Sequence, residues 1–169
     1  MGVLYDYYRA AGRDAAIADP ENPRAVDEPE RPVFDAVDAK SIDPHVAFGQ
    51  LVALAAGVPY SIDLIDSVML YPPPEGAPQS DEEWESLPED SPYLDGSWIA
   101  ELPVMARDAL ADLDDSRVPE VAGRWSEAEE FKSWSPEDRR HLFALTEQFV
   151  GLARRAKADD QLLYCWSCT

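Results

Sequence analysis

The sequence predicts an α+β fold, in which a small sheet including the N- and C-terminal strands packs against two main helices. β-Branched and aromatic residues open the chain in GVLYDYY and close it in QLLYCWSC, which is typical of strands. Two longer segments carry apolar residues at helical spacing. A chain of 169 residues, 46% of them apolar, can bury one core without disulfides, so we expect a single domain over residues 1–169.

The first part of the chain predicts one strand and little else that is regular. Gly2–Tyr8 is the strand, and the following RAAGRDAAIAD favours a short, weak helix. Pro20–Pro32 contains four prolines and mixed charge, so it predicts a loop.

The first main helix lies in SIDPHVAFGQLVALAAG. Asp43 is a favourable N-cap, and Pro44 suits the first helical position, where its missing N–H costs nothing. Gly57 can end the helix in the left-handed conformation. Two central strands are then predicted, at Val68–Tyr71 and Ser97–Leu102.

Three helices and a strand account for the rest of the chain. Pro103 begins a helix that runs to Leu113, and VPEVAGRW favours a short one. The last and longest helix begins after Ser135, where Asp138 completes an imperfect capping box. Its apolar stripe comprises Leu142, Leu145, Phe149, Leu152, Ala153 and Ala156. QLLYCWSC is the terminal strand.

The formal charge of −20, from 34 acids against 14 bases, excludes some partners and favours others. Nucleic-acid phosphates and anionic membrane surfaces are repelled by such a field, so we expect neither as a partner. A cationic protein partner is favoured, although high charge also serves solubility alone. The opening lacks a basic leader and a long apolar run, so we expect no signal peptide and a cytoplasmic protein. Arg outnumbers Lys 11 to three, which is typical of GC-rich bacterial genomes.

Pro72–Gly96 predicts a long acidic, proline-rich loop appended to the core, with six prolines, eight acids and no base. It lies within a longer stretch, Ser41–Ala106, that has 12 acids and no Lys or Arg. Trp84, Tyr93 and Trp98 are candidate interface anchors, or they fix the loop to its own domain. The candidate partner-binding residues are Asp81, Glu82, Glu83, Trp84 and Glu85. We therefore expect a binding or regulatory protein, of the immunity or inhibitor kind, rather than an enzyme.

An enzyme is the first alternative. Glu129 and Glu130 lie near Trp125 and Phe131 in sequence, where partial burial would raise the pKa of a carboxyl group. The competing interpretation is a helix end whose aromatic residues dock on the core. The chain has no nucleophile-elbow motif and no Gly-rich phosphate loop, so we expect no cofactor.

A metal or thiol protein built on Cys165 and Cys168 is the second alternative. A reactive C-x-x-C needs its first Cys at a helix N-terminus, and no residues remain here to build that helix. In a strand, residues i and i+3 point to opposite faces, which separates the two sulfurs. Two Cys with His45 and His141 would make a zinc ligand set, but these His are far apart in sequence. We therefore expect a buried strand and no metal.

The order of elements resembles that of a known group of proteins. A strand opens at MGVLYDYY, the SIDPHVAFGQLVALAAG helix precedes mid-chain, and RWSEAEEF precedes a long helix and the terminal strand. This arrangement resembles the YfbM-like group of small bacterial proteins and, more closely, related proteins of high-GC bacteria with the same Tyr-Cys-Trp ending. The resemblance implies an α+β fold and a cytosolic protein. It transfers no functional residues, because the shared motifs include no catalytic signature.

Overall fold

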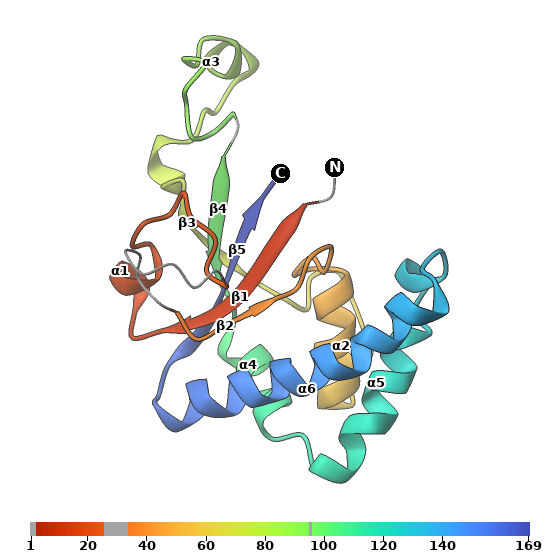
Figure 1. Ribbon diagram of the computed structural model, residues 1–169. Helices are drawn as coiled ribbons and strands as arrows, with labels where there is room; N and C mark the ends of the chain where they lie inside the picture. The colour runs from red at the N-terminus through yellow and green to blue at the C-terminus, as the bar shows by residue number, and fades with distance from the viewer. Residues whose placement is uncertain (1–2, 26–33, 95) are drawn as a thin grey trace.

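The computed structural model describes residues 3–25, 34–94 and 96–169 and is built on a five-stranded antiparallel sheet (Figure 1). Its strand order is β2-β1-β5-β4-β3. The strands are β1 (Leu4–Ala10), β2 (Ala36–Asp38), β3 (Val68–Tyr71), β4 (Ser97–Glu101) and β5 (Leu162–Cys168). The predicted α+β fold is confirmed, and both terminal strands belong to the sheet. The three-residue edge strand β2 was not predicted, because it is too short to display an alternating pattern.

Strand β5 lies at the centre of the sheet, which explains its nearly continuous apolar sequence. It pairs with β1 on one side and β4 on the other, so that Cys165 stands between Tyr7 and Ala100. The four residues Leu163–Trp166 are all buried. The sequence of a strand that is covered on both faces is a continuous apolar run and does not alternate between apolar and polar residues.

Four helices cover one face of the sheet, and they form the main core with it (Figure 1). They are α2 (Ala47–Ala56), α4 (Val104–Ala111), α5 (Val118–Ser126) and α6 (Pro136–Ala158). The sequence predicted α2 and α6 as the two main helices, and both line the core. The shorter α4 and α5 complete the layer by burying Leu110, Val121 and Trp125.

Capping residues place the two main helices as predicted, with one shift. The Asp43 carboxylate accepts backbone N–H bonds from His45, Val46 and Ala47, but the residues after Asp43 form a turn, and regular α2 begins only at Ala47. Gly57 ends α2 with φ 69°, in the left-handed region that favours glycine. The Ser135 hydroxyl accepts the Asp138 N–H at 3.1 Å, which starts α6.

The other face of the sheet is covered by α1 (Arg13–Ala16) and the segment that follows it. The Trp166 indole N–H donates to the Pro20 carbonyl at 2.8 Å. The guanidinium of Arg24 lies 5.3 Å from the centre of the Tyr8 ring. The predicted loop Pro20–Pro32 has no regular structure as far as Ala25, and its remainder lies outside the described residues.

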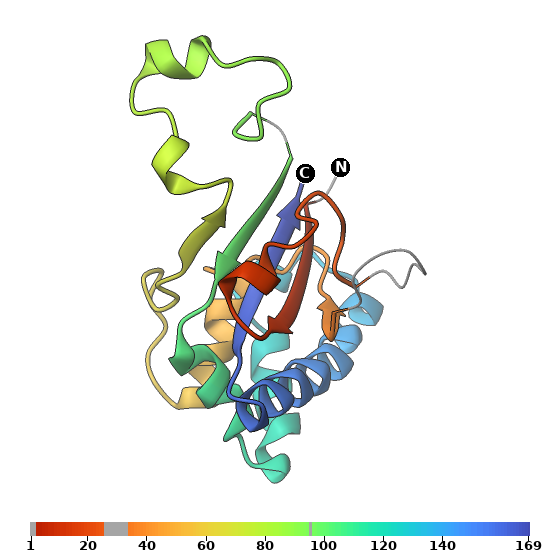
Figure 2. The ribbon, with the colours of Figure 1, turned by 90° about the vertical axis from the view of Figure 1, so that its left-hand side faces the viewer.

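The segment Pro72–Gly96 differs from the predicted irregular loop, because it contains two helical turns. A 3₁₀ turn, η1 (Pro74–Gly76), and a short helix, α3 (Asp81–Glu85), project beyond the end of the sheet between β3 and β4 (Figure 2). Two further 3₁₀ turns, η2 (Asp115–Arg117) and η3 (Glu129–Phe131), lie in the helical layer. Across the described ranges of the chain, none of the helices combines the length and apolar composition that crossing a bilayer requires.

Candidate binding site

The projecting segment Pro72–Gly96, called the arm below, is held together by contacts within itself (Asp95 lies outside the described residues). The Tyr93 hydroxyl donates to the Pro73 carbonyl at 2.6 Å and ties the two ends of the arm. Ser80 caps α3 by accepting the N–H of Glu83, whose carboxylate accepts the Gln79 N–H at 2.6 Å. This arrangement is close to a capping box, except that the carboxylate accepts the N–H of the residue before the N-cap. The arm is therefore an ordered unit with few buried residues.

Two hydrogen bonds fix the base of the arm to the segment that covers the opposite face of the sheet. The Ser97 hydroxyl donates to the Pro20 carbonyl at 2.5 Å. The Tyr71 hydroxyl donates to the Glu21 carboxylate at 2.5 Å, and this bond together with burial raises the pKa of Tyr71 to about 12. Tyr71 therefore stays protonated at neutral pH and acts as a fixed donor.

The helical layer leaves part of its face of the sheet uncovered at the end nearest the arm. Register places Tyr5, Ser167 and Trp98 side by side on β1, β5 and β4. The next row on the same face, which contains Cys165, is buried in the main core. Trp98 is 50% exposed, which in the described part of the chain makes it the third most exposed large apolar side chain, after Ile62 and Val104. A half-exposed indole at the end of an interior strand is available for contact with a ligand or partner.

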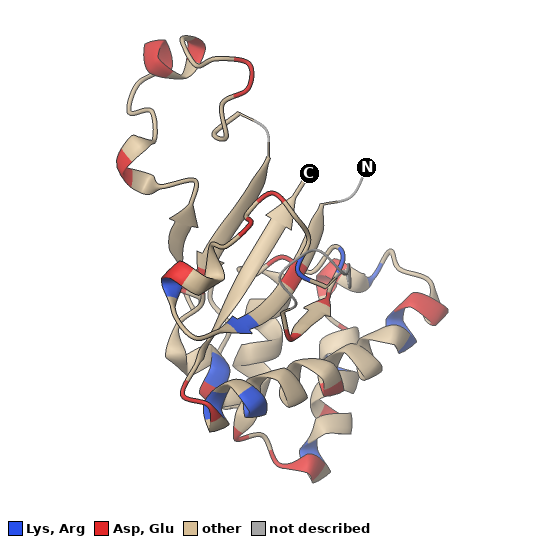
Figure 3. Cartoon of the chain, turned by 60° about the vertical axis from the view of Figure 1, so that its left-hand side comes forward, with Lys and Arg blue, Asp and Glu red and all other residues tan. Residues whose placement is uncertain are grey.

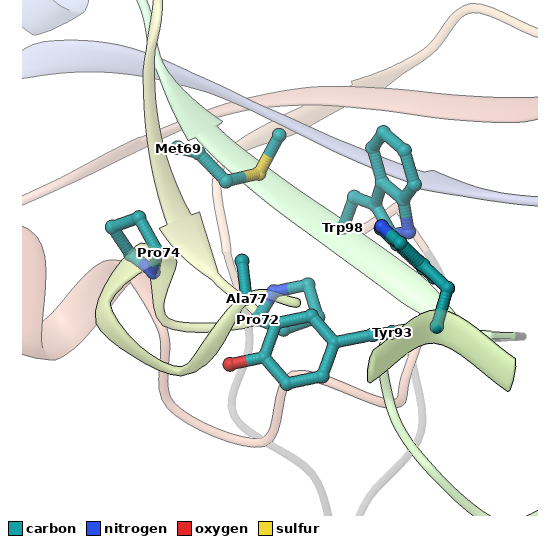
Figure 4. A pocket seen from close by; sticks show the side chains of 7 residues that line it. Met69, Pro72, Pro74, Ala77, Tyr93 and Trp98 are labelled. Carbon is teal, nitrogen blue, oxygen red and sulfur yellow. The ribbon is translucent and has the colours of Figure 1, made fainter. Parts of the chain in front are cut away.

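Three hollows meet at Trp98. The one beneath the arm, called the arm hollow, has a volume of about 190 Å³ (Figure 4). It is lined by Met69, Pro72, Pro74, Ala77, Trp84, Tyr93 and Trp98. Trp84 is 43% exposed, so both tryptophans of this hollow offer part of their rings to solvent. None of the seven lining side chains is a carboxylate, and the hydroxyl of Tyr93 donates to the Pro73 carbonyl, so this hollow is suited to binding rather than to catalysis.

The other two hollows extend the same surface across the sheet. One, of about 260 Å³, runs from Trp98 past Tyr5 to the corner at Asp43–His45 before α2. The second, of about 200 Å³, lies between Trp98, Leu94 and the residues next to the two chain ends. Tyr5 and Ser167 line both. Partial burial and the nearby Asp43 carboxylate raise the pKa of Tyr5, so its hydroxyl is neutral near pH 7.

The arm carries acids and no base, whereas the cations of the chain lie elsewhere (Figure 3). The predicted partner-binding residues Asp81, Glu82, Glu83, Trp84 and Glu85 together make up α3, and all five are exposed. Within the part of the chain that the structure describes, the ion pairs lie outside the arm. The arm therefore keeps an uncompensated negative field beside the apolar hollow.

The alternative carboxylate site is not assembled around Trp125. Trp125 is fully buried, and its indole N–H donates to the Ala47 carbonyl at 2.8 Å. Glu129 is exposed and pairs with Lys132, and Glu130 is exposed and accepts a hydrogen bond from Gln50 at 2.7 Å. The indole thus acts as a core residue, while the two carboxylates lie on the surface.

The cysteines occupy a strand, as predicted, and they lie on opposite faces of it. Cys165 is buried in the main core, whereas Cys168 packs at the edge of the cluster on the other face. Burial raises the pKa of the Cys165 thiol well above its ordinary value, the opposite of what a reactive thiolate needs. His45 and His141 line different hollows. In the described ranges no group of three or more His, Cys, Asp or Glu side chains is placed to hold a metal.

Comparison with protein-family models, curated proteins and solved structures finds no match to this chain. The resemblance to the YfbM-like group therefore stays a prediction, and the function has to be argued from the site. Sequence reasoning identified Trp84, Tyr93 and Trp98 but missed Met69, Tyr5 and Ser167. The alternation within each strand indicates which residues share a face, but only the pairing of distant strands reveals that these residues adjoin Trp98.

Proposed function

We propose that this protein is a binding or regulatory protein, of the immunity or inhibitor kind, that engages a cationic protein partner through the arm and the Trp98 surface. One observation carries the proposal: an apolar hollow with two half-exposed tryptophans lies directly beneath an acidic arm without Lys or Arg. Catalysis is the weaker candidate, because Glu129 and Glu130, the carboxylates suggested by the sequence, are exposed, whereas Trp125 is buried in the core.

The two parts of this surface suit two stages of association. Exposed carboxylates act over about 8–10 Å at physiological salt, so they steer a basic partner and raise its association rate. Tryptophan is enriched among the few interface residues that supply most of the binding energy, because it buries a large rigid area. The arm then steers the partner, and Trp84 and Trp98 hold it.

The test is capture of a partner from native lysate, followed by kinetics with the purified partner. One variant neutralises the arm by converting Asp81 to Asn and Glu82, Glu83 and Glu85 to Gln. Glutamine at position 83 keeps a side-chain oxygen for the Gln79 N–H, so the arm stays folded. A matched control changes the net charge equally on the exposed helical surface, through E120Q, E127Q, E137Q and E147Q.

The arm variant is expected to associate about tenfold more slowly at low salt, with a flatter salt dependence, while the control stays close to wild type. Equal losses in both variants would show that net charge alone is responsible. Association that does not respond to salt, or tight binding to DNA, would also contradict the proposal.

A further inference from the structure

The arm hollow has a composition that restricts what it can bind. Three aromatic side chains, Trp84, Tyr93 and Trp98, line it together with Met69 and small apolar residues (Figure 4). The one hydroxyl among them, on Tyr93, already donates to the Pro73 carbonyl. The walls therefore offer aromatic faces and little hydrogen bonding, which suits either an apolar group or a weakly hydrated cation.

The surrounding charge decides between these two. Eight acids and no base belong to the arm, and α3, which carries Trp84, bears four of the acids. A neutral apolar group gains nothing from this field. A cation over an aromatic ring gains from both the ring and the carboxylates, and the attraction grows when water is excluded.

We infer that the arm hollow receives an arginine side chain of the cationic partner, with the guanidinium against the indoles of Trp84 and Trp98. This inference rests on the proposed function and names the group that the site recognises. Arginine is favoured over lysine because its planar guanidinium stacks on aromatic rings and is less strongly hydrated than an ammonium group. The volume of about 190 Å³ equals that of about six water molecules, which leaves room for a guanidinium group and its adjoining methylenes.

Two capped tripeptides test the inference, acetyl-Gly-Arg-Gly-amide and its citrulline counterpart. Citrulline has nearly the same shape as arginine but no charge. Binding is followed in the full chain by the ¹⁵N–H signals of the tryptophan indoles, assigned with W84F and W98F. Trp134 serves as an internal control in the same spectrum, because it packs against Phe131 beside the main core and lines none of the three hollows at Trp98.

The arginine peptide is expected to shift the Trp84 and Trp98 signals and to leave that of Trp134 in place. It should bind about 3- to 30-fold more tightly than the citrulline peptide, the range that cation–π attraction provides. W98L should remove this preference, whereas W98F should retain part of it. Since Trp98 is half exposed, both variants are expected to fold.

Equal affinity for the two peptides would overturn the inference and make the hollow an apolar anchor. An equal shift of the Trp134 signal would overturn it too, since the peptide would then be attracted by net charge alone. The two proposals fail separately. If a captured partner depends on the arm acids but the indole signals do not respond to the arginine peptide, only the proposed arginine site is wrong. If the indole signals respond to the arginine peptide but no captured partner depends on the arm acids, the proposed function is wrong.

Discussion

Replacing Glu75–Asp90 with a Gly-Ser linker of about six residues tests whether the arm serves binding rather than the fold. No residue of this segment is buried, and none belongs to the two apolar clusters. The connection Pro72–Gly96 has 25 residues, and shortening it to about 15 saves only about 0.5 kcal/mol of loop entropy. The main destabilising effect is the loss of the partial burial of Trp84. It is offset because the deleted residues no longer lose conformational entropy on folding. We therefore expect the free energy of unfolding to change by about 1 kcal/mol or less.

Thermal unfolding measured by circular dichroism checks this magnitude, since about 1 kcal/mol corresponds to about 2–4 °C in a chain of this size. Partner binding should be lost in the same variant, because Trp84 and seven of the eight acids of the arm are gone. W84A is the matched point variant, and it should also melt near the wild-type temperature. A fall of more than about 10 °C in either variant would refute the reasoning and identify the arm as structural.

Three further predictions concern the body of the protein. W125F should reduce the free energy of unfolding by about 2 kcal/mol in chemical denaturation, because a buried ring shrinks and the hydrogen bond from the indole N–H is lost. In the native protein, Cys168 should react with a thiol reagent while Cys165 reacts only after unfolding, and replacing both with Ser should leave partner binding unchanged. Hydrogen bonding to Arg155 lowers the pKa of Asp35 below 3.8. The ionised Asp35 therefore stabilises the folded state fully above pH 3.8, and this contribution is lost as the pH falls through the lowered pKa. In acid titrations, D35N should lose less stability than the wild type.

The elements of the fold were largely predictable because local chemistry specifies them. Capping residues located α6 and, within three residues, α2, and Gly57 marked the end of α2. The apolar stripe of α6 is buried as its spacing requires. Strand β2 escaped prediction because three residues cannot establish a period. The order of the strands was also out of reach, since it depends on contacts between segments that are far apart in the chain.

The candidate site was predictable only in part, for the same reason. The acidic stretch and Trp84 are visible in the sequence, and so is the proximity of Trp98 to the arm. The sequence does not reveal that the helical layer stops short of the row that holds Tyr5 and Ser167. Trp125 illustrates the opposite error, because acids next to an aromatic residue in sequence suggested a perturbed carboxyl. In the structure the indole turns into the core and the acids remain on the surface.

The internal contacts of the arm bear on how strongly such a site could bind. A loop that orders only on binding loses conformational entropy at that moment, which weakens the complex. Here the bond from Tyr93 to Pro73 and the two hydrogen bonds that start α3 are already formed in the free chain. A Cβ on Gly76 would lie 2.5 Å from the Tyr93 hydroxyl, so a larger residue at that position would displace the hydroxyl from its present contact. The arm can thus present Trp84 and its acids in a fixed arrangement, and most of the entropic cost of ordering has been met during folding.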